Sequence, residues 1–288
     1  MGNSYARRVH EVMDHVRRNV AGDLSLDELA GIAHFSPHHF HRIFSSVTGE
    51  TVAAFTRRAR LERAVYLMRG APDRTLSSIA AEVGFATPSD FSRVFKASFG
   101  QTPSSWDRRS RLDGQPDLGP PDQGVTGHPD LTARVVERPA CHVAYVRIKE
   151  PWQDDHLAAG YARLISWLSE RSIPWRTGQL VGVSWESGKA TPLDRLVYDL
   201  GITVDPEIPA GDEVAIQHFP AARAVEVHCR SLADTARAWD LLYCSWLPGS
   251  GYEPADLPAM KRFRTTPDLF DAAAWDVDCS IALRRRRP

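Results

Sequence analysis

The chain has little cysteine and no long apolar run. None of its four cysteines is spaced as Cys-x-x-Cys, so a zinc ribbon or redox dithiol is disfavoured and reduced core residues are expected. No stretch is apolar enough to span a bilayer, and no signal peptide is recognisable. We therefore expect a cytoplasmic protein with no membrane partner. The four cysteines are Cys141, Cys229, Cys244 and Cys279.

The sequence also lacks the signatures of common enzymes. It contains no serine or cysteine triad motif and no glycine-rich loop that could cradle a phosphate. These absences favour a binding protein, and we expect no catalytic residues and no cofactor.

The first hundred residues contain one small unit twice. Ser25–Phe44 aligns with Thr75–Phe95 at an offset of fifty residues, with one residue inserted in the second copy. Ser25 and Glu28 form a capping-box pattern, and Ser36-Pro37 and Thr87-Pro88 each start a second helix. Each copy is therefore predicted to be two short helices joined by a tight turn.

The second helix of each copy has an apolar face and a polar face. Phe40, Ile43 and Phe44 follow helical spacing and are expected to be buried. A tight helix pair with a polar second helix is the shape that enters the DNA major groove. The candidate base contacts are His38, His39, His41 and Arg42 in the first copy and Ser89, Asp90 and Arg93 in the second. The candidate phosphate contacts are Arg57, Arg58, Arg60 and Lys96.

Arg42 and Arg93 are the firmest of these candidates. They occupy equivalent positions in the two copies, and a guanidinium can bind guanine through two hydrogen bonds. Asp90 has two open interpretations, because its carboxylate could accept from cytosine or cap its helix. Each phosphate candidate has an alternative too, as part of the solvated face of a helix.

Three histidines of the first copy, His34, His38 and His41, could be considered zinc ligands. His34 precedes the turn, however, and no cysteine or carboxylate lies nearby to complete the site. We therefore expect no metal, and favour a pH-dependent affinity for DNA phosphates.

The second copy carries a specific resemblance. Gly84-Phe85, Phe91-Ser92-Arg93-Val94-Phe95-Lys96 and Phe99-Gly100-Gln101-Thr102-Pro103 resemble the signature of the AraC/XylS transcription regulators. The resemblance covers roughly residues 5 to 108, including a connecting helix over Val52–Arg69. It implies that the two helix-turn-helix units read successive major-groove segments of double-stranded DNA.

Charge and composition divide the chain. Residues 1–110 carry a net charge of +4 and the remainder −5, as expected for a basic nucleic-acid module fused to a mildly acidic partner. Between Arg111 and His128 the sequence is rich in glycine and proline, which predicts a linker. The predicted domains are 1–110 and 131–288, joined by a linker at 111–130.

The second domain contains a fainter repeat. Pro139-Ala140 matches Pro220-Ala221, and Asp199-Leu200-Gly201-Ile202 echoes Asp278-Cys279-Ser280-Ile281. This predicts two pseudo-symmetric βαββ halves, a pattern that resembles the GyrI-like effector-binding domain. The fold class is therefore multidomain, with an all-α N-terminal domain of two helix-turn-helix units and an α+β C-terminal domain.

The second resemblance implies an aromatic groove with a buried carboxylate that binds cationic, lipophilic molecules. The expected glutamate is replaced, because the matching stretch reads Lys261-Arg262-Phe263. Either the effector is neutral or anionic, or Glu186 takes over the carboxylate role. The candidate ligand-binding residues are Tyr145, Trp185, Glu186, Trp246, Phe263 and Trp275.

We expect a sequence-specific transcription regulator that binds DNA and senses a small molecule. Two alternatives for the C-terminal domain stay open. It could be a protein-interaction module, with RNA polymerase as a candidate partner, or a small-molecule hydrolase. A lysine at the acid position, Lys261, disfavours hydrolysis.

Overall fold

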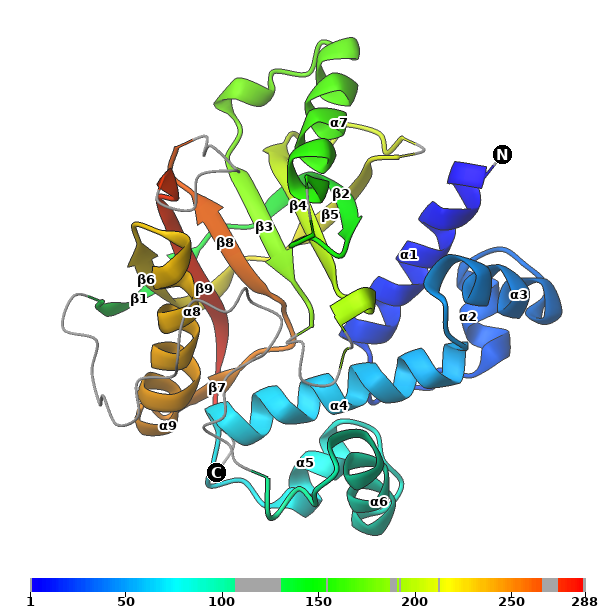
Figure 1. Ribbon diagram of the computed structural model, residues 1–288, viewed down its shortest axis with the longest axis vertical. Helices are drawn as coiled ribbons and strands as arrows, with labels where there is room; N and C mark the ends of the chain where they lie inside the picture. Colours follow the sequence, from blue (N-terminus) through cyan, green and yellow to red (C-terminus); the bar gives the residue numbers. More distant parts are fainter. Residues whose placement is uncertain are drawn as a thin grey trace.

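A computed structural model describes residues 2–106, 131–153, 155–186, 191, 193–211, 213–265 and 274–286. The linker predicted at 111–130 lies outside the described residues. The N-terminal part is entirely helical, and the C-terminal part is a sheet with helices on it (Figure 1). The first six helices are α1 (Gly2–Arg18), α2 (Leu26–Ile32), α3 (Pro37–Thr48), α4 (Val52–Gly70), α5 (Leu76–Glu82) and α6 (Pro88–Phe99).

The sequence repeat is a structural repeat. Ser25 Oγ accepts from the Glu28 backbone N–H (3.3 Å) at the start of α2, and Thr75 Oγ1 accepts from the Ser78 N–H (3.1 Å) at the start of α5. The turn after each of these helices has one residue in the left-handed region, His34 (φ 53°) in the first copy and Gly84 (φ 82°) in the second. The prediction of two matched helix pairs is confirmed.

Helix α4 connects the two units and is buried around most of its surface. Val52, Phe55 and Ala59 pack into the core of the first unit, whereas Leu61 and Val65 pack into the core of the second. A remaining side of α4 faces the C-terminal domain, as shown by its buried polar residues Arg58, Glu62 and Arg69. The helix therefore touches both helix-turn-helix units and the sheet domain.

The C-terminal domain is built on one antiparallel sheet in the order β1-β6-β9-β8-β3-β4-β2-β5, with β7 pairing to β9. Helices α7 and α8 lie on one face of it (Figure 1). The strands are β1 (Ala133–Arg138), β2 (Cys141–Lys149), β3 (Leu180–Ser184), β4 (Val197–Val204), β5 (Ala215–Phe219), β6 (Ala222–Cys229), β7 (Tyr252–Pro254), β8 (Ala259–Phe263) and β9 (Val277–Arg285). The helices are α7 (His156–Glu170), η1 (Trp175–Thr177), η2 (Leu193–Arg195), α8 (Leu232–Asp240), η3 (Leu241–Trp246) and α9 (Leu247–Gly249).

The strand order confirms two pseudo-symmetric halves. β2-α7-β3-β4 corresponds to β6-α8-β8-β9, and the sheet order is unchanged when the two sets are exchanged. The structure adds one strand to each half that the sequence did not predict. These two strands are exchanged between the halves: β1 pairs with β6, and β5 pairs with β2. The pseudo-twofold axis passes between β3 and β8, where Gly182 is opposite Lys261.

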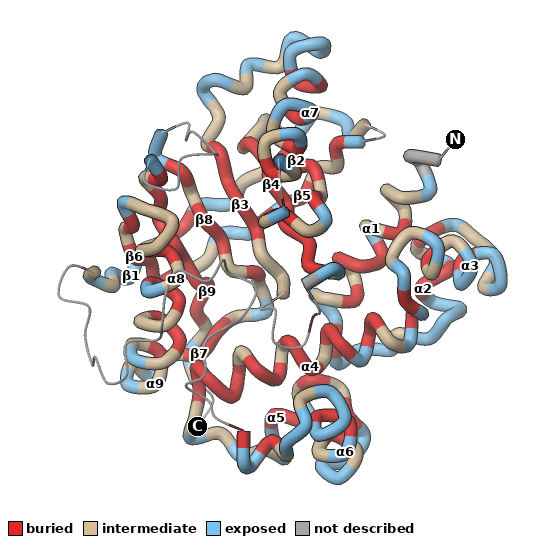
Figure 2. Tube along the Cα trace, viewed as in Figure 1, coloured by how far each residue is buried: buried red, intermediate tan, exposed pale blue. Residues whose placement is uncertain are grey.

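Buried residues are concentrated in the sheet and along α4, while residues on the outer sides of α3 and α6 are exposed (Figure 2). The largest core lies where α7 and α8 meet the sheet, with Trp167, Trp239 and Tyr243 among its residues. Among the described residues, no helix combines the length and the apolar character needed to cross a membrane.

Two glycines in left-handed conformation give a matched stability test. A Cβ on Gly84 would lie 2.6 Å from the Val20 carbonyl oxygen, whereas a Cβ on Gly100 (φ 74°) would meet nothing within 4 Å. We expect Gly100→Ala to cost about 1–2 kcal/mol for the left-handed backbone alone. Gly84→Ala should cost about 1–3 kcal/mol more because of the steric overlap. Urea unfolding of both variants measures the difference, and equal losses would contradict this account.

Candidate functional site

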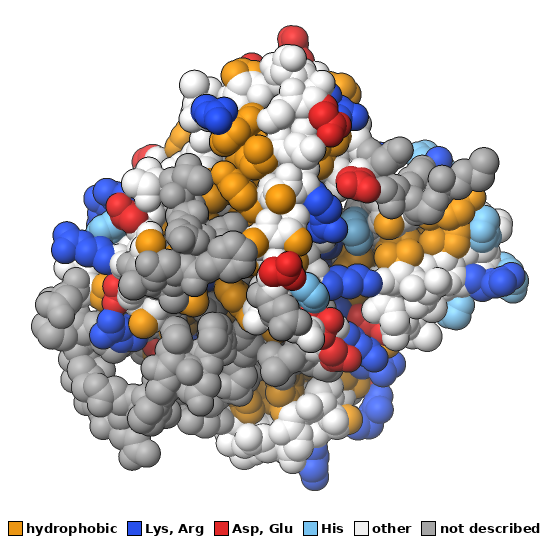
Figure 3. All heavy atoms as spheres, turned by 45° about the horizontal axis from the view of Figure 1, so that its top comes forward, with side chains coloured by type: hydrophobic (Ala, Val, Ile, Leu, Met, Phe, Trp, Pro, Cys, Tyr) orange, Lys and Arg blue, Asp and Glu red, His pale blue; other side chains and the backbone are white. Residues whose placement is uncertain are grey.

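The polar faces of α3 and α6 are exposed. His38, His39, His41 and Arg42 are exposed on α3, and Ser89, Arg93 and Lys96 are exposed on α6, with Asp90 half-buried. Figure 3 shows histidine and arginine or lysine side chains gathered at the outer end of the lobe formed by α1 to α3. The two second helices of the repeat therefore both present their polar side chains to solvent.

An open groove of about 1320 Å³ separates the two units. Its walls include His41 from the first unit, Asp90 and Arg93 from the second, and Arg57 from the connecting helix. Four of the residues predicted to contact DNA thus line one continuous surface.

The contacts of Asp90 show whether its carboxylate caps α6 or is available to a base. The cap of α6 is Thr87, whose Oγ1 accepts from the Asp90 backbone N–H (3.0 Å). The Asp90 carboxylate forms an ion pair with Arg93. The capping interpretation of the Asp90 side chain was therefore wrong, and the carboxylate holds an arginine that is itself a candidate base contact.

The prediction that Arg58 contacts DNA phosphate is contradicted by its position. Arg58 is only 9% exposed, and its Nε and Nη2 donate to Glu50 Oε1 at 3.2 and 2.7 Å. Its Nη1 donates to Thr191 Oγ1 (2.6 Å) in the C-terminal domain. Arg58 lies on the side of α4 that faces the sheet domain, whereas its neighbour Arg57 is exposed.

The two domains meet at a buried carboxylate. Asp14 on α1 accepts from Arg147 Nη2 (2.7 Å), from the Tyr145 hydroxyl (3.0 Å) and from Arg17 Nη1 (3.2 Å). Asp199 in turn holds Arg147 through two hydrogen bonds of 2.6 Å. Burial opposes the charge of Asp14, but the attraction of Arg147 and Arg17 outweighs it and holds the pKa of Asp14 below its usual value.

Further polar contacts extend this interface along α4 and α5. Most pair an arginine with an acceptor in the opposite domain. They include Arg63 with the carbonyls of Pro254 and Ala255 (2.9 and 3.0 Å), Arg69 with Asp240 (3.2 Å), Arg74 with Glu253 (3.3 Å) and Arg284 with Glu82.

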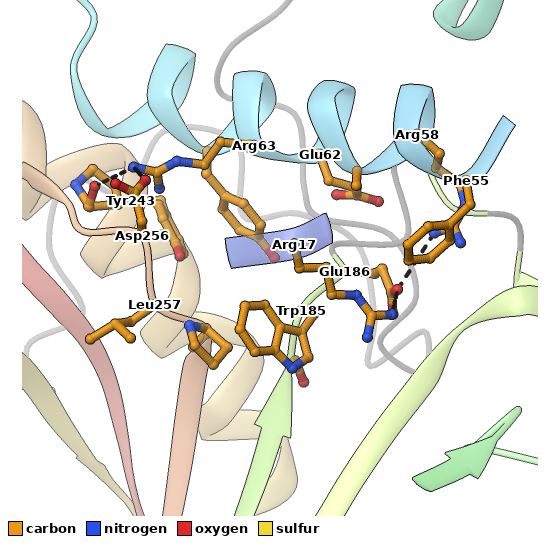
Figure 4. A pocket seen from close by; sticks show the side chains of 16 residues that line it. Arg17, Phe55, Arg58, Glu62, Arg63, Trp185, Glu186, Tyr243, Asp256 and Leu257 are labelled. Atoms are coloured by element: carbon orange, nitrogen blue, oxygen red, sulfur yellow. Dashed lines mark hydrogen bonds and ion pairs between the residues drawn. The ribbon is translucent and has the colours of Figure 1, made fainter. Parts of the chain in front are cut away.

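A cavity that is partly open to solvent lies between the domains beside these contacts. Figure 4 shows Trp185 across the cavity from Glu62 and Arg63 of α4, with Glu186 beside Arg17. Glu186 forms ion pairs with Arg17 and Arg58. Trp185 and Glu186, both predicted as ligand contacts, are thus brought into one cavity.

The other four predicted ligand residues lie elsewhere, so the expectation of one shared aromatic groove was wrong. The Tyr145 hydroxyl donates a hydrogen bond to Asp14, and Trp246 stacks on Tyr252 (6.3 Å between ring centroids). Phe263 and Trp275 are core residues that contact each other edge to face. Side-chain direction along strands and loops decides these positions, and composition alone does not reveal it.

Lys261 lies inside an aromatic cage on the pseudo-twofold axis. It is 1% exposed, and its Nζ is 5.2, 5.8 and 5.4 Å from the ring centroids of Trp152, Tyr198 and Trp275. Its ammonium has no hydrogen-bond partner among the described residues. Burial lowers the pKa of Lys261, because removal from water disfavours the charged form.

Sequence reasoning missed Asp14, Arg17 and Arg147, the residues that join the domains. A signal was present, since His10, Asp14 and Arg17 follow i, i+4, i+7 spacing beside the apolar stripe of the leading helix. Among the described residues, no group of three or more histidine, cysteine or acidic side chains could hold a metal ion.

Both parts of the chain match known families. A model of a helix-turn-helix domain matches residues 29–109, and a model of the GyrI-like small molecule binding domain matches residues 132–282. A DNA gyrase inhibitor of Erwinia billingiae is 26% identical over 162 residues, which cover 54% of this chain and 99% of that protein.

Two further relatives match a shorter part of the chain. The bifunctional transcriptional activator/DNA repair enzyme AdaA of Bacillus subtilis is 31% identical over 103 residues, which are 35% of this chain and 48% of that protein. The transcriptional regulator Rob of Salmonella typhimurium is 37% identical over 87 residues, 30% of each chain. The match thus spans less than half of AdaA and less than a third of Rob.

His10 gives the interface a pH dependence. Burial and the nearby Arg147 guanidinium lower the pKa of His10 from 6.5 to about 3. Between these values the unfolded chain binds a proton that the folded chain does not, so stability falls as pH falls through this window. The free energy of unfolding of the parent protein should therefore fall between pH 7 and pH 5. In the His10→Gln variant this fall should be smaller by roughly 1–2 kcal/mol. Urea unfolding at both pH values tests this, and equal losses in both proteins would contradict it.

The solitary buried ammonium of Lys261 should cost stability. Lys261→Met keeps the length of the side chain and removes the charge, so we expect the variant to be more stable by about 1–3 kcal/mol. Lys96→Met on the exposed face of α6 is the matched control and should change stability by less than about 0.5 kcal/mol. A destabilised Lys261→Met protein would show that the three ring contacts outweigh the loss of hydration.

Proposed function

Because the chain belongs to the GyrI-like small molecule binding family and carries an AraC-type helix-turn-helix domain, we propose that it is a sequence-specific DNA-binding transcription regulator. In this proposal the C-terminal domain senses a small molecule, and the helical domain reads double-stranded DNA.

The observation that carries the proposal is the pairing of two equivalent exposed helices on one rigid connector. α3 and α6 present Arg42 and Arg93, and α4 holds both units through a shared core. The 19 residues of α4 span about 28 Å. This length is close to the roughly 34 Å between successive turns of the major groove. One chain can therefore place two reading helices on adjacent turns.

The C-terminal domain leaves the predicted base contacts uncovered. Its described contacts reach α1 through Asp14, α4 through Arg58 and α5 through Glu82. It also reaches the C-terminal end of α3, where Lys149 Nζ donates to the Val47 carbonyl (2.6 Å). DNA can therefore approach the polar faces of α3 and α6 without separating the domains.

The two alternatives receive less support. Hydrolysis would need an accessible acid, but the position expected to carry it holds the buried Lys261. A protein-docking surface would show as an apolar patch. Among the described residues, the exposed large hydrophobic side chains are Tyr5, Leu26 and Val135, which lie on three different elements, α1, α2 and β1. Engagement of RNA polymerase stays a prediction.

The proposal is tested by selecting a preferred duplex from random sequences and measuring mobility shifts on it. Arg42→Ala and Arg93→Ala should each weaken binding to the selected duplex by about 1–3 kcal/mol and change binding to random DNA little. Arg223→Ala, an exposed arginine on β6, is the control and should bind both duplexes as the parent does. Failure to select any duplex would refute sequence-specific binding. Equal losses of affinity on both duplexes would show that these arginines do not contact bases.

A further inference from the structure

The cavity between the domains is lined by both of them. Arg17 comes from α1 and Phe55, Glu62 and Arg63 come from α4, whereas Trp185 lies just after β3. A molecule in this space therefore contacts the helix that carries both reading units and the domain that belongs to a small-molecule-binding family at the same time.

The carboxylates of this cavity already have donors. Glu186 is paired with Arg17 and Arg58, and Glu62 accepts from the Thr191 hydroxyl (2.8 Å). Asp256 is paired with Arg63 (2.5 Å) and with Arg284 (3.1 Å). A cationic ligand would have to displace one of these arginines to gain a partner.

The groups left over are donors. Trp185 Nε1 and Arg63 Nε are buried and have no hydrogen-bond acceptor among the described residues. A buried donor without a partner costs about 1–3 kcal/mol, which a bound acceptor would recover. The lining also contains the aromatic rings of Phe55, Tyr66 and Tyr243, against which a planar ligand could pack.

From these contacts we infer that the cavity between α4 and Trp185 binds a small aromatic molecule bearing an acceptor oxygen, neutral or anionic, and that this molecule is the effector of the regulator. The inference rests on the proposed function and adds the place and the chemical class of the ligand. The acceptor oxygen takes the Trp185 indole N–H, and the ring packs against the aromatic side chains of the lining.

The same geometry gives the direction of coupling. A ligand that contacts both domains stabilises the docked arrangement in which they are seen, and in that arrangement both reading helices are exposed. The ligand should therefore tighten binding to the selected duplex.

The test uses three probes of one shape and different charge: benzoate, benzamide and benzamidinium. Each is titrated into the full-length, ¹⁵N-labelled protein up to about 10 mM, because molecules of this size bind weakly. Benzoate and benzamide should shift the indole N–H resonance of Trp185, which is assigned by its disappearance in Trp185→Phe. Benzamidinium, which offers donors only, should leave it unchanged.

Trp185→Phe keeps an aromatic ring and removes the donor, so its affinity for benzoate should fall about tenfold or more. Trp246→Phe, on the stacked pair outside the cavity, is the control and should bind benzoate as the parent does. In the parent protein, saturating benzoate should tighten binding to the selected duplex about fivefold or more.

Three results would overturn the inference: a Trp185 resonance unmoved by benzoate, equal binding of benzamidinium, or full benzoate affinity in Trp185→Phe. Unchanged or weakened duplex binding in the presence of benzoate would overturn its role as effector site. Duplex selection and the Arg42 and Arg93 variants are measured without any probe. The proposed function can therefore stand when the ligand inference fails.

Discussion

The arrangement of the two domains depends on one buried carboxylate, Asp14. It accepts from two arginines and a tyrosine hydroxyl, and Asp199 balances the charge of the arginine that comes from the sheet. Removing one partner of such a buried set leaves a charge unpaired and typically costs about 3–5 kcal/mol. Because losing one partner is so costly, we expect these contacts to form together. They hold α1 against the sheet in one position.

Because α4 packs against the same domain, this contact also determines how the DNA-reading surface is supported. Arg58, Arg63 and Arg69 project from one side of α4 into the sheet domain, and its other sides hold the cores of the two reading units. Each domain thus constrains the other along α4, in addition to the contact that Asp14 makes from α1. A shift of that helix would move both recognition helices together, without any change in their own packing.

Local features of the sequence predicted local structure well. The caps at Ser25 and Thr75 and the apolar spacing of Phe40 and Phe44 determine helices over a few residues, and these helices are where they were expected. The echo of Asp199 in Asp278 predicted the two halves of the sheet, because equivalent strands carry equivalent residues.

Contacts between residues far apart in the sequence could not be predicted from such local features. Arg58 resembles its exposed neighbour Arg57 in sequence, but it is buried beside Glu50 of its own domain and is faced by Thr191 and Glu186 from the other domain. The six ligand candidates were chosen by residue type, and two of them, Trp185 and Glu186, line the cavity between the domains. The exchange of β1 and β5 was also missed, since strand order depends on pairing across more than ninety residues in the case of Ala133 and Val227.

The exchange of first strands makes the C-terminal domain a single folding unit. β1 lies at the edge of the second half and β5 at the edge of the first, so neither half completes its own sheet. A polypeptide holding one half alone would leave a strand without its neighbour and an edge without its cover, and a second copy of the same polypeptide would supply both. The fold thus has, within one chain, the strand exchange that is typical of a domain-swapped dimer.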